Sequence, residues 1–168
     1  MNNNGFEIER KFLIAYPERE LLDRGESSVI TQTYLAKDGS GMNSRVRKRV
    51  WGDKTEYTHT RKKHVSDIRR VEEERLISEN EYNELLKSAD LRRKTIRKTR
   101  YCIESGAHTF EIDIFPFWDD RAIMEVELSH EDERFTVPQG IEIIREVTDD
   151  KRYTNSSLAR EIPQDEIT

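Results

Sequence analysis

The sequence predicts a mainly β domain of the α+β class, built from antiparallel strands with a few short helices packed outside the sheet. Apolar and charged residues alternate along most of the chain, and a side-chain period of two is that of a β-strand. Short clusters rich in Gly, Asp and Ser separate these segments, as turns do between antiparallel strands. Charged residues make up 38% of the chain, yet they alternate with Val, Ile, Phe, Leu and Tyr, which indicates a folded domain.

The first strand spans residues 6–13 and shows the pattern most clearly. Its charged face carries Glu7, Glu9 and Lys11, and its other face is apolar. Further strands with the same alternation or with β-branched and aromatic content are predicted at 29–35, 44–50, 55–63, 70–77, 92–104, 109–115 and 122–128. Residues 141–147 fit either a strand or a short helix.

Three helical segments are expected between and after the strands. Residues 18–23 fit a short helix that ends before Gly25. Ser78 and Glu81 form a capping box that starts a helix continuing to about Ala89. Residues 155–161 fit one or two helical turns. With 168 residues, no internal repeat and no interdomain linker, the chain 1–168 is expected to be a single domain with a loose C-terminal end.

The charges are grouped by strand, and the sign changes between strands. Acids share a face at positions 7 and 9, 72 and 74, 111 and 113, and 125 and 127, and bases at 11, 45, 47, 62, 98 and 100. Periodicity alone fits either a flat sheet with one wet face or a closed barrel with a polar interior. The grouping favours the closed barrel, because opposed rows neutralise each other, whereas isolated buried charges cost several kcal/mol each.

Rows of opposite charge suit a polyphosphate with a divalent cation. Arginine donors match phosphate oxygens, and Mg²⁺ binds carboxylate and phosphate oxygens. The sequence has no Walker-type loop, no zinc-ligand spacing among its four histidines and no Gly-x-Ser-x-Gly motif. The net charge of −5 argues against a nucleic-acid partner. A single cysteine, no bilayer-length apolar run and no signal-peptide pattern make a cytoplasmic location the expectation, and the oligomeric state, including a homo-oligomer, stays open.

The Glu7-x-Glu9-x-Lys11 segment resembles the N-terminal signature of the CYTH superfamily, the triphosphate tunnel metalloenzymes. The chain is similar to the compact bacterial tripolyphosphatase branch over nearly its whole length. Further matches are Tyr34, Arg45-x-Arg47, Lys62, Glu72-x-Glu74, Lys98-x-Arg100, Glu111-x-Asp113, Glu125-x-Glu127 and Lys151-x-Tyr153-x-Asn155. The resemblance implies a closed eight-stranded antiparallel β-barrel whose charged tunnel holds a linear triphosphate.

The resemblance also implies roles for individual residues. Metal binding, of two Mg²⁺ or Mn²⁺ ions, is implied for Glu7, Glu9, Asp113, Glu125 and Glu127. Phosphate binding is implied for Lys11, Arg45, Arg47, Lys62, Lys98, Arg100 and Lys151, although Lys151 also fits a solvated charge cluster. The general base is either a metal-bound water or a catalytic Tyr34–Lys62 pair. Glu72, Glu74 and Glu111 fit either ligands or partners that balance the arginines.

The expected reaction is metal-dependent hydrolysis of tripolyphosphate to pyrophosphate and phosphate. Class IV adenylyl cyclase is the main alternative, because it uses the same metals and phosphate grip, and a non-catalytic polyphosphate-binding module is the third possibility. Thiamine triphosphatases of the family carry a tryptophan where this chain has Asn43, which argues against that activity. RNA triphosphatases would need an added basic surface, which the net charge does not suggest.

Overall fold

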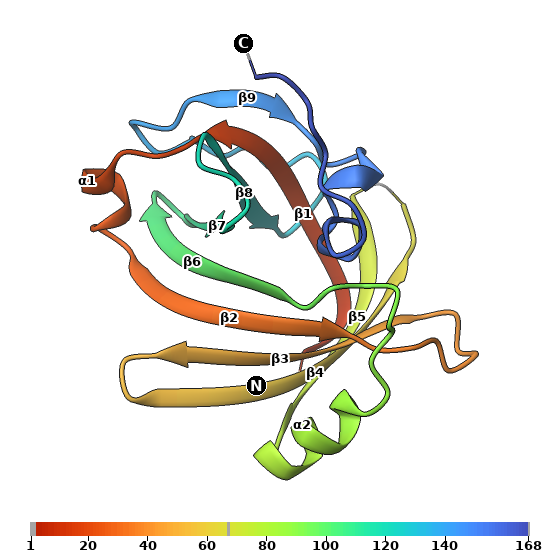
Figure 1. Ribbon diagram of the computed structural model, residues 1–168. Helices are drawn as coiled ribbons and strands as arrows, with labels where there is room; N and C mark the ends of the chain where they lie inside the picture. The colour runs from red at the N-terminus through yellow and green to blue at the C-terminus, as the bar shows by residue number, and fades with distance from the viewer. Residues whose placement is uncertain (1–2, 67, 168) are drawn as a thin grey trace.

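The computed structural model describes residues 3–66 and 68–167, which form nine strands, three α-helices and one 3₁₀ helix (Figure 1). The strands are β1 (Asn3–Ala15), β2 (Glu26–Tyr34), β3 (Asn43–Trp51), β4 (Lys54–His64), β5 (Arg69–Ile77), β6 (Ile96–Ser105), β7 (His108–Ile114), β8 (Arg121–Leu128) and β9 (Ile143–Glu146). The helices are α1 (Arg19–Leu22), α2 (Glu79–Leu86), η1 (Lys151–Tyr153) and α3 (Asn155–Leu158). In the described part of the chain, no helix is long and apolar enough to cross a membrane.

The first strand closes the sheet into a barrel. β1 pairs with β8 along one edge through residues 8–15 and with β5 along the other through residues 3–8. The ring therefore runs β1-β5-β4-β3-β2-β6-β7-β8, antiparallel throughout, and β9 adds to β1 beyond the end of β5. This confirms the predicted eight-stranded antiparallel barrel, with one extra strand.

The apolar strand faces point out of the barrel and are covered there. Ile8, Phe12 and Ile14 of β1 pack with neighbours on β7 and β8 and with two leucines of α1. α2 lies outside the barrel and covers Val46 and Ile77 with Tyr82 (Figure 1). With the outer faces covered, the charged faces are turned inward, as the grouping of charges predicted.

At one end of the barrel the inward rows become apolar. Leu13 follows Lys11 on β1, and Phe115 and Ile123 continue the inward rows of β7 and β8. These three residues are buried together with Trp118 and Tyr153 in one core cluster. This cluster makes a dry floor, so the charged space is confined to the rest of the barrel.

Several predicted element boundaries need correction. The strand predicted at 92–104 begins only at Ile96, because the carboxylate of Asp90 accepts hydrogen bonds from the backbone and side chain of Arg92 and holds a turn there. The ambiguous segment 141–147 forms strand β9. The capping box is confirmed, since Ser78 Oγ accepts from Glu81 N at 3.1 Å, but α2 ends at Leu86, three residues earlier than predicted.

Gly25 has a different role from the helix stop expected from the sequence. α1 ends at Leu22, and Gly25 lies where β2 begins against β6. A Cβ at this position would lie 2.5 Å from Ile103 Cδ1 and 2.6 Å from the Cys102 carbonyl oxygen. We expect Gly25→Ala to lower the free energy of unfolding by about 1–3 kcal/mol because backbone would have to shift.

Urea denaturation checks this expectation. The control is Ser27→Ala, an exposed position on the same strand, which should change stability by less than about 0.5 kcal/mol. An unfolding midpoint for Gly25→Ala that matches the wild type would contradict the close approach of β2 and β6.

Candidate active site

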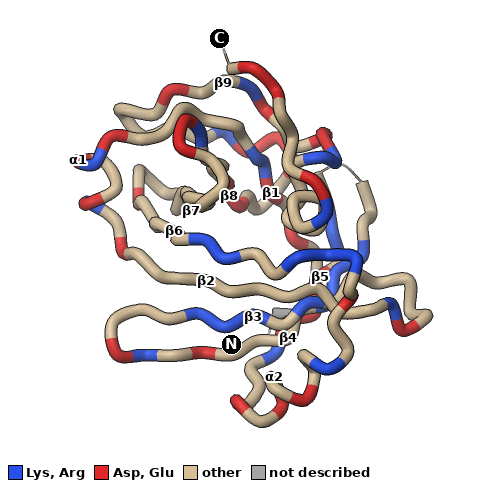
Figure 2. Tube along the Cα trace, viewed as in Figure 1, with Lys and Arg blue, Asp and Glu red and all other residues tan. Residues whose placement is uncertain are grey.

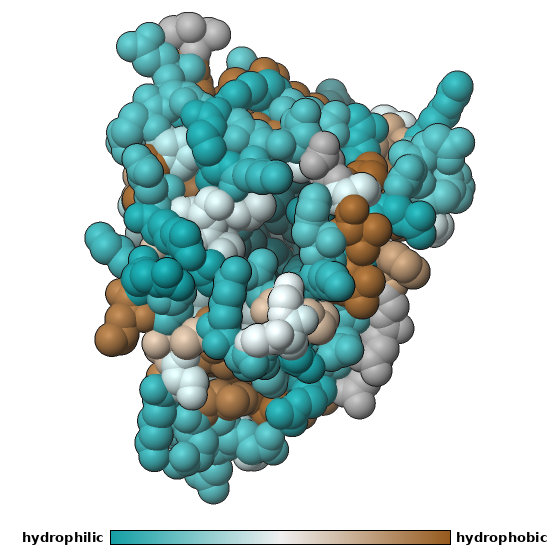
Figure 3. All heavy atoms as spheres, turned by 90° about the vertical axis from the view of Figure 1, so that its right-hand side faces the viewer, coloured by the Kyte–Doolittle hydropathy of each residue, from teal (hydrophilic) through white to brown (hydrophobic). Residues whose placement is uncertain are grey.

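A cavity of about 490 Å³ opens on the side of the barrel that carries α3. This side faces the viewer in Figure 3, where it is hollowed near the centre and bordered mostly by hydrophilic residues. The lining combines inward side chains of the strands with the C-terminal segment: Glu9, Lys11, Tyr34, Arg45, Thr60, Lys62, Arg70, Arg93, Lys151, Asn155 and Arg160 are among them. The charged interior is thus open to a ligand.

One wall of the interior is acidic and is formed by β1 and its neighbour β8. Glu9 lies opposite Glu127 in the strand register, and Glu125 lies between Lys11 of β1 and Glu111 of β7. Burial, Glu125 and Glu7 together raise the pKa of Glu9 to about 8. Burial, Glu7 and Glu111 likewise raise the pKa of Glu127. Additional positive charge beside these carboxylates would therefore stabilise their ionised forms.

The opposite wall is basic. β3 stands four strands from β8 in the ring, and the basic segments of β3 and β6 flank β2 in Figure 2. Arg45 is buried and Arg47 half-buried, and the buried Nε atoms of both have no hydrogen-bond partner among the described residues. A terminal nitrogen of Arg47 donates to the Gln32 side-chain oxygen at 3.2 Å. Burial, Arg45 and Arg100 lower the pKa of Arg47 to about 9. Both arginines therefore keep donors that are available to an anion.

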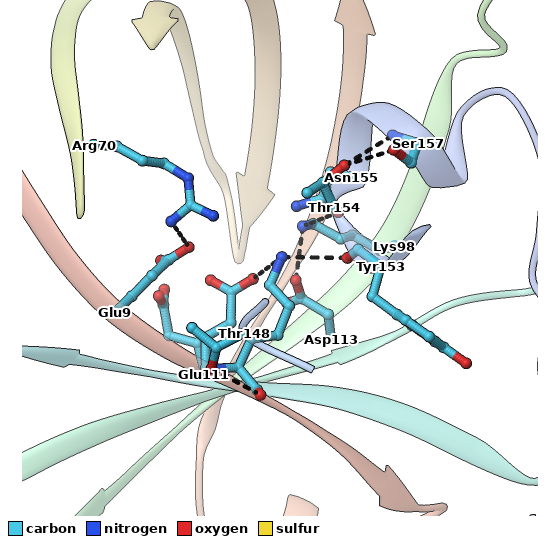
Figure 4. A network of polar contacts seen from close by, with 12 residues as sticks. Glu9, Arg70, Lys98, Glu111, Asp113, Thr148, Tyr153, Thr154, Asn155 and Ser157 are labelled. Atoms are coloured by element: carbon cyan, nitrogen blue, oxygen red, sulfur yellow. Dashed lines mark hydrogen bonds and ion pairs between the residues drawn. The ribbon is translucent and has the colours of Figure 1, made fainter. Parts of the chain in front are cut away.

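Lys98, Arg100 and Asp113 form a compact ion cluster beside the basic wall. Arg100 donates to both Asp113 oxygens at 2.8 and 2.9 Å and to Glu111 at 2.9 Å. Figure 4 shows Lys98 between Asp113, at 2.7 Å, and the Asn155 side-chain oxygen, at 3.3 Å. Burial opposes ionisation of Asp113, but Arg100 and Lys98 hold its pKa well below the ordinary value.

The contacts in this cluster concern the predicted roles of Asp113 and Glu111. The oxygens of Asp113, which the resemblance implies as a metal ligand, contact two cations here, so metal binding by Asp113 stays a prediction. Glu111 occupies the balancing role that was one of its two alternatives.

Three cations contact the acidic wall directly. Lys62 Nζ lies 3.1 Å from Glu7, and Lys11 Nζ lies 3.4 Å from Glu125. Arg70 points toward Glu9 and donates to it at 3.1 Å (Figure 4). Within the described ranges no three Asp, Glu, His or Cys side chains converge as a ready metal site. A metal ion at the wall would therefore compete with Lys62 and Arg70.

The other predicted site residues lie in the cavity wall, beside it or at its mouth. Tyr34 and Lys62 both line the cavity, but Tyr34 Oη accepts from Gln32 at 3.3 Å, whereas Lys62 pairs with Glu7. Glu74 accepts from Thr60 at 3.0 Å. Burial opposes the charge on Arg45, but Tyr34 and Glu72 beside it raise its pKa overall. Lys151 is exposed at the mouth.

Three arginines are among the lining residues that the sequence analysis did not assign to the site. Arg70 shares the inward face of β5 with Glu72 and Glu74, so a period of two counted backward would have found it. Arg93 lies in a turn, and Arg160 lies two residues after the end of the short helix α3. No strand periodicity marks them.

The chain is similar in sequence to two inorganic triphosphatases. An inorganic triphosphatase from Acetivibrio thermocellus is 34% identical over 157 residues, which cover 93% of this chain and 94% of the relative. This chain belongs to the inorganic triphosphatase family. A second inorganic triphosphatase, from Nitrosomonas europaea, is 34% identical over 162 residues, 94% of this chain and 99% of the relative. The predicted resemblance to the tripolyphosphatase branch of the CYTH superfamily is confirmed.

Solved structures agree with this membership of the inorganic triphosphatase family. The crystal structure of the inorganic triphosphatase NE1496 matches with a TM-score of 0.58 and 32% identity, over 94% of this chain and 96% of that one. A candidate adenylate cyclase from Bacillus halodurans matches with a TM-score of 0.55 at 17% identity, over 76% of this chain and 84% of that one, and so shares the fold. No protein-family model matches the chain.

Proposed function

We propose that this chain hydrolyses inorganic tripolyphosphate to pyrophosphate and phosphate in a reaction that depends on a divalent metal ion. The observation that carries the proposal is the pair of unbalanced walls. Arg45 and Arg47 keep buried Nε donors without partners on one side, and burial and neighbouring carboxylates raise the pKa values of Glu9 and Glu127 on the other. A linear polyanion with bound cations supplies the charge that each wall lacks.

The donor set at the acidic wall fits Mg²⁺ or Mn²⁺. Glu7, Glu9, Glu125 and Glu127 offer carboxylate oxygens, which are the ligands that these hard cations prefer. The raised pKa values of Glu9 and Glu127 support a need for a cation there. When bound, such ions would neutralise phosphate oxygens and lower the pKa of a coordinated water, and two ions would do both.

The chain's own cations have separate tasks in this proposal. Arg45 and Arg47 bind phosphate oxygens through planar donors and stabilise the charge on the transferring phosphoryl group in a dry site. Lys62 leaves Glu7 for the phosphate chain, and Arg70 does the same from Glu9. The dry floor around Leu13 and Phe115 excludes bulk water from the inner end.

The proton of the attacking water needs an acceptor in the cavity. The Tyr34 hydroxyl and the Lys62 amine both reach the cavity, and they remain the candidates for accepting the proton of the attacking water. Tyr34 is the sole Phe, Tyr or Trp among the described lining residues. A purine would find little to stack on, which supports tripolyphosphate over ATP and hydrolysis over cyclisation.

Product analysis by phosphorus NMR tests the proposal. Purified protein with Mg²⁺ or Mn²⁺ should convert tripolyphosphate into equal amounts of pyrophosphate and phosphate, and Glu127→Gln should abolish this. Cyclic AMP and pyrophosphate formed from ATP would make the protein a cyclase instead. Tripolyphosphate that binds but is not cleaved would make it a binding module.

A further inference from the structure

We propose that Arg93 and Arg160 form a subsite for the outer terminal phosphate at the mouth of the cavity, and that this subsite selects inorganic tripolyphosphate over nucleoside triphosphates. The inference rests on the proposed function and adds the residues that would set its specificity. Both arginines line the same cavity as Lys11, Arg45 and Lys62. Neither belongs to the rows of charges that the strand pattern predicts.

Arg93 carries a buried charge without a dedicated partner. Its side chain is only 6% exposed, and its Nε atom has no hydrogen-bond partner among the described residues. The nearby carboxylate is Asp90, at 3.7 Å. Asp90 already accepts three hydrogen bonds from the backbone and side chain of Arg92. The guanidinium of Arg93 is therefore free to bind an anion in the cavity.

Arg160 is brought beside Arg93 by the backbone. Lys94 N donates to Ala159 O at 2.7 Å, which ties the turn before β6 to the end of α3. Burial and the charge of Arg160 lower the pKa of Arg93. In the described part of the chain no carboxylate lies within ion-pair distance of Arg160. Two neighbouring guanidinium groups that repel each other are stabilised when a phosphate binds between them.

The same geometry disfavours a nucleoside. The Arg93 guanidinium lies over the Tyr34 ring, 5.4 Å from its centroid, and so covers the ring on which a purine could stack. A terminal phosphate has three free oxygens and its full charge, whereas a phosphate esterified to a nucleoside has fewer oxygens free for two arginines. A nucleoside at the outer end would thus leave the buried Arg93 and the exposed Arg160 without a phosphate to share, which is selection against that substrate.

Three substitutions and a matched control test this subsite. Arg93→Met and Arg160→Met remove the charges, Arg93→Lys keeps one, and Arg97→Met removes a charge from the outer face of β6 close by in sequence. We expect Arg93→Met to raise KM for tripolyphosphate about tenfold with kcat within about twofold, and to leave kcat/KM for ATP unchanged. The preference for tripolyphosphate then falls about tenfold, Arg93→Lys restores part of it, and Arg97→Met matches the wild type.

Two kinetic results would contradict the subsite. Equal losses for both substrates would show a structural role, and unchanged kinetics in Arg93→Met and Arg160→Met would overturn the subsite. Arg160 is exposed, so its variant tests the subsite without a buried change. If the wild type hydrolyses nothing, the proposed function fails, and the increase in melting temperature on adding tripolyphosphate without metal decides the inference: it should be smaller in Arg93→Met than in Arg97→Met, and equal increases would overturn it.

Discussion

Replacing Glu9 with glutamine should lower kcat/KM for tripolyphosphate by about a thousandfold or more, because it removes a carboxylate from the wall proposed to hold the metal ions. The same change should make the metal-free protein more stable at pH 8. Glu9 has a pKa of about 8 in the folded protein, raised by burial, Glu125 and Glu7, against an ordinary value of 4.5. The loss of activity and the gain in stability have the same cause, a carboxylate crowded among others.

The pH dependence fixes the sign of the stability effect. Between pH 4.5 and 8 the folded protein keeps a proton on Glu9 that the unfolded chain has released. The free energy of unfolding therefore falls as pH rises through this window, by up to about 1.4 kcal/mol per pH unit. Glutamine does not titrate, so Glu9→Gln should lose this slope. Urea denaturation at several pH values measures it.

Glu73→Gln is the matched control for Glu9→Gln. Glu73 lies on β5 with 49% of its side chain exposed and contacts Arg61 on the outside of the barrel. We expect near wild-type activity and the wild-type pH slope from this variant. A Glu9→Gln protein that keeps both its activity and the wild-type slope would exclude Glu9 from a metal-binding wall.

Arg47→Met and Arg100→Met should separate binding from stability. Arg47 donates to Gln32 but forms no ion pair with a carboxylate among the described residues, and burial, Arg45 and Arg100 lower its pKa. Removing it should cut kcat/KM about a hundredfold, because a phosphate partner is lost, but change stability by no more than about 1 kcal/mol. Arg100 instead holds Asp113 through two hydrogen bonds, so its loss should cost about 3–5 kcal/mol of stability.

Urea denaturation and steady-state kinetics on both variants check this contrast. The first measures the free energy of unfolding and the second the affinity and rate with tripolyphosphate. Equal destabilisation by the two changes would mean that the contacts of Arg47 in the folded protein stabilise it as much as Asp113 stabilises Arg100. Arg47 would then be a structural ion and not a free phosphate ligand.

The period of two predicted the strands and most of the inward rows, whereas the closed eight-stranded barrel was predicted by the grouping of the charges and by the family resemblance. Once β1 is a strand, Glu7, Glu9 and Lys11 must share a face. The register to β8 then aligns Glu9 with Glu127 and Lys11 with Glu125. The same rule would have found Arg70. The dry floor escaped notice because Leu13 and Ile123 continue charged rows with apolar residues, and only the packed structure shows that they meet.

Other features depend on contacts that no local pattern encodes. The turn at residues 92–95 follows from hydrogen bonds to Asp90, which interrupt an otherwise good strand pattern. Arg93 reaches the cavity only because that turn is tied to the end of α3. The pairing of Asp113 with Lys98 and Arg100 likewise depends on how β6 and β7 align.

The central claim is that the barrel interior holds the triphosphate between a metal-binding acidic wall and a basic wall. The most direct test is a crystal structure with Mn²⁺ and a non-hydrolysable imido analogue of tripolyphosphate, with the metal located by its anomalous scattering. We predict anomalous peaks beside Glu7, Glu9 and Glu127, and phosphates in contact with Arg45 and Arg47. Peaks confined to the outer surface, with no phosphate in contact with Arg45 or Arg47, would contradict the claim.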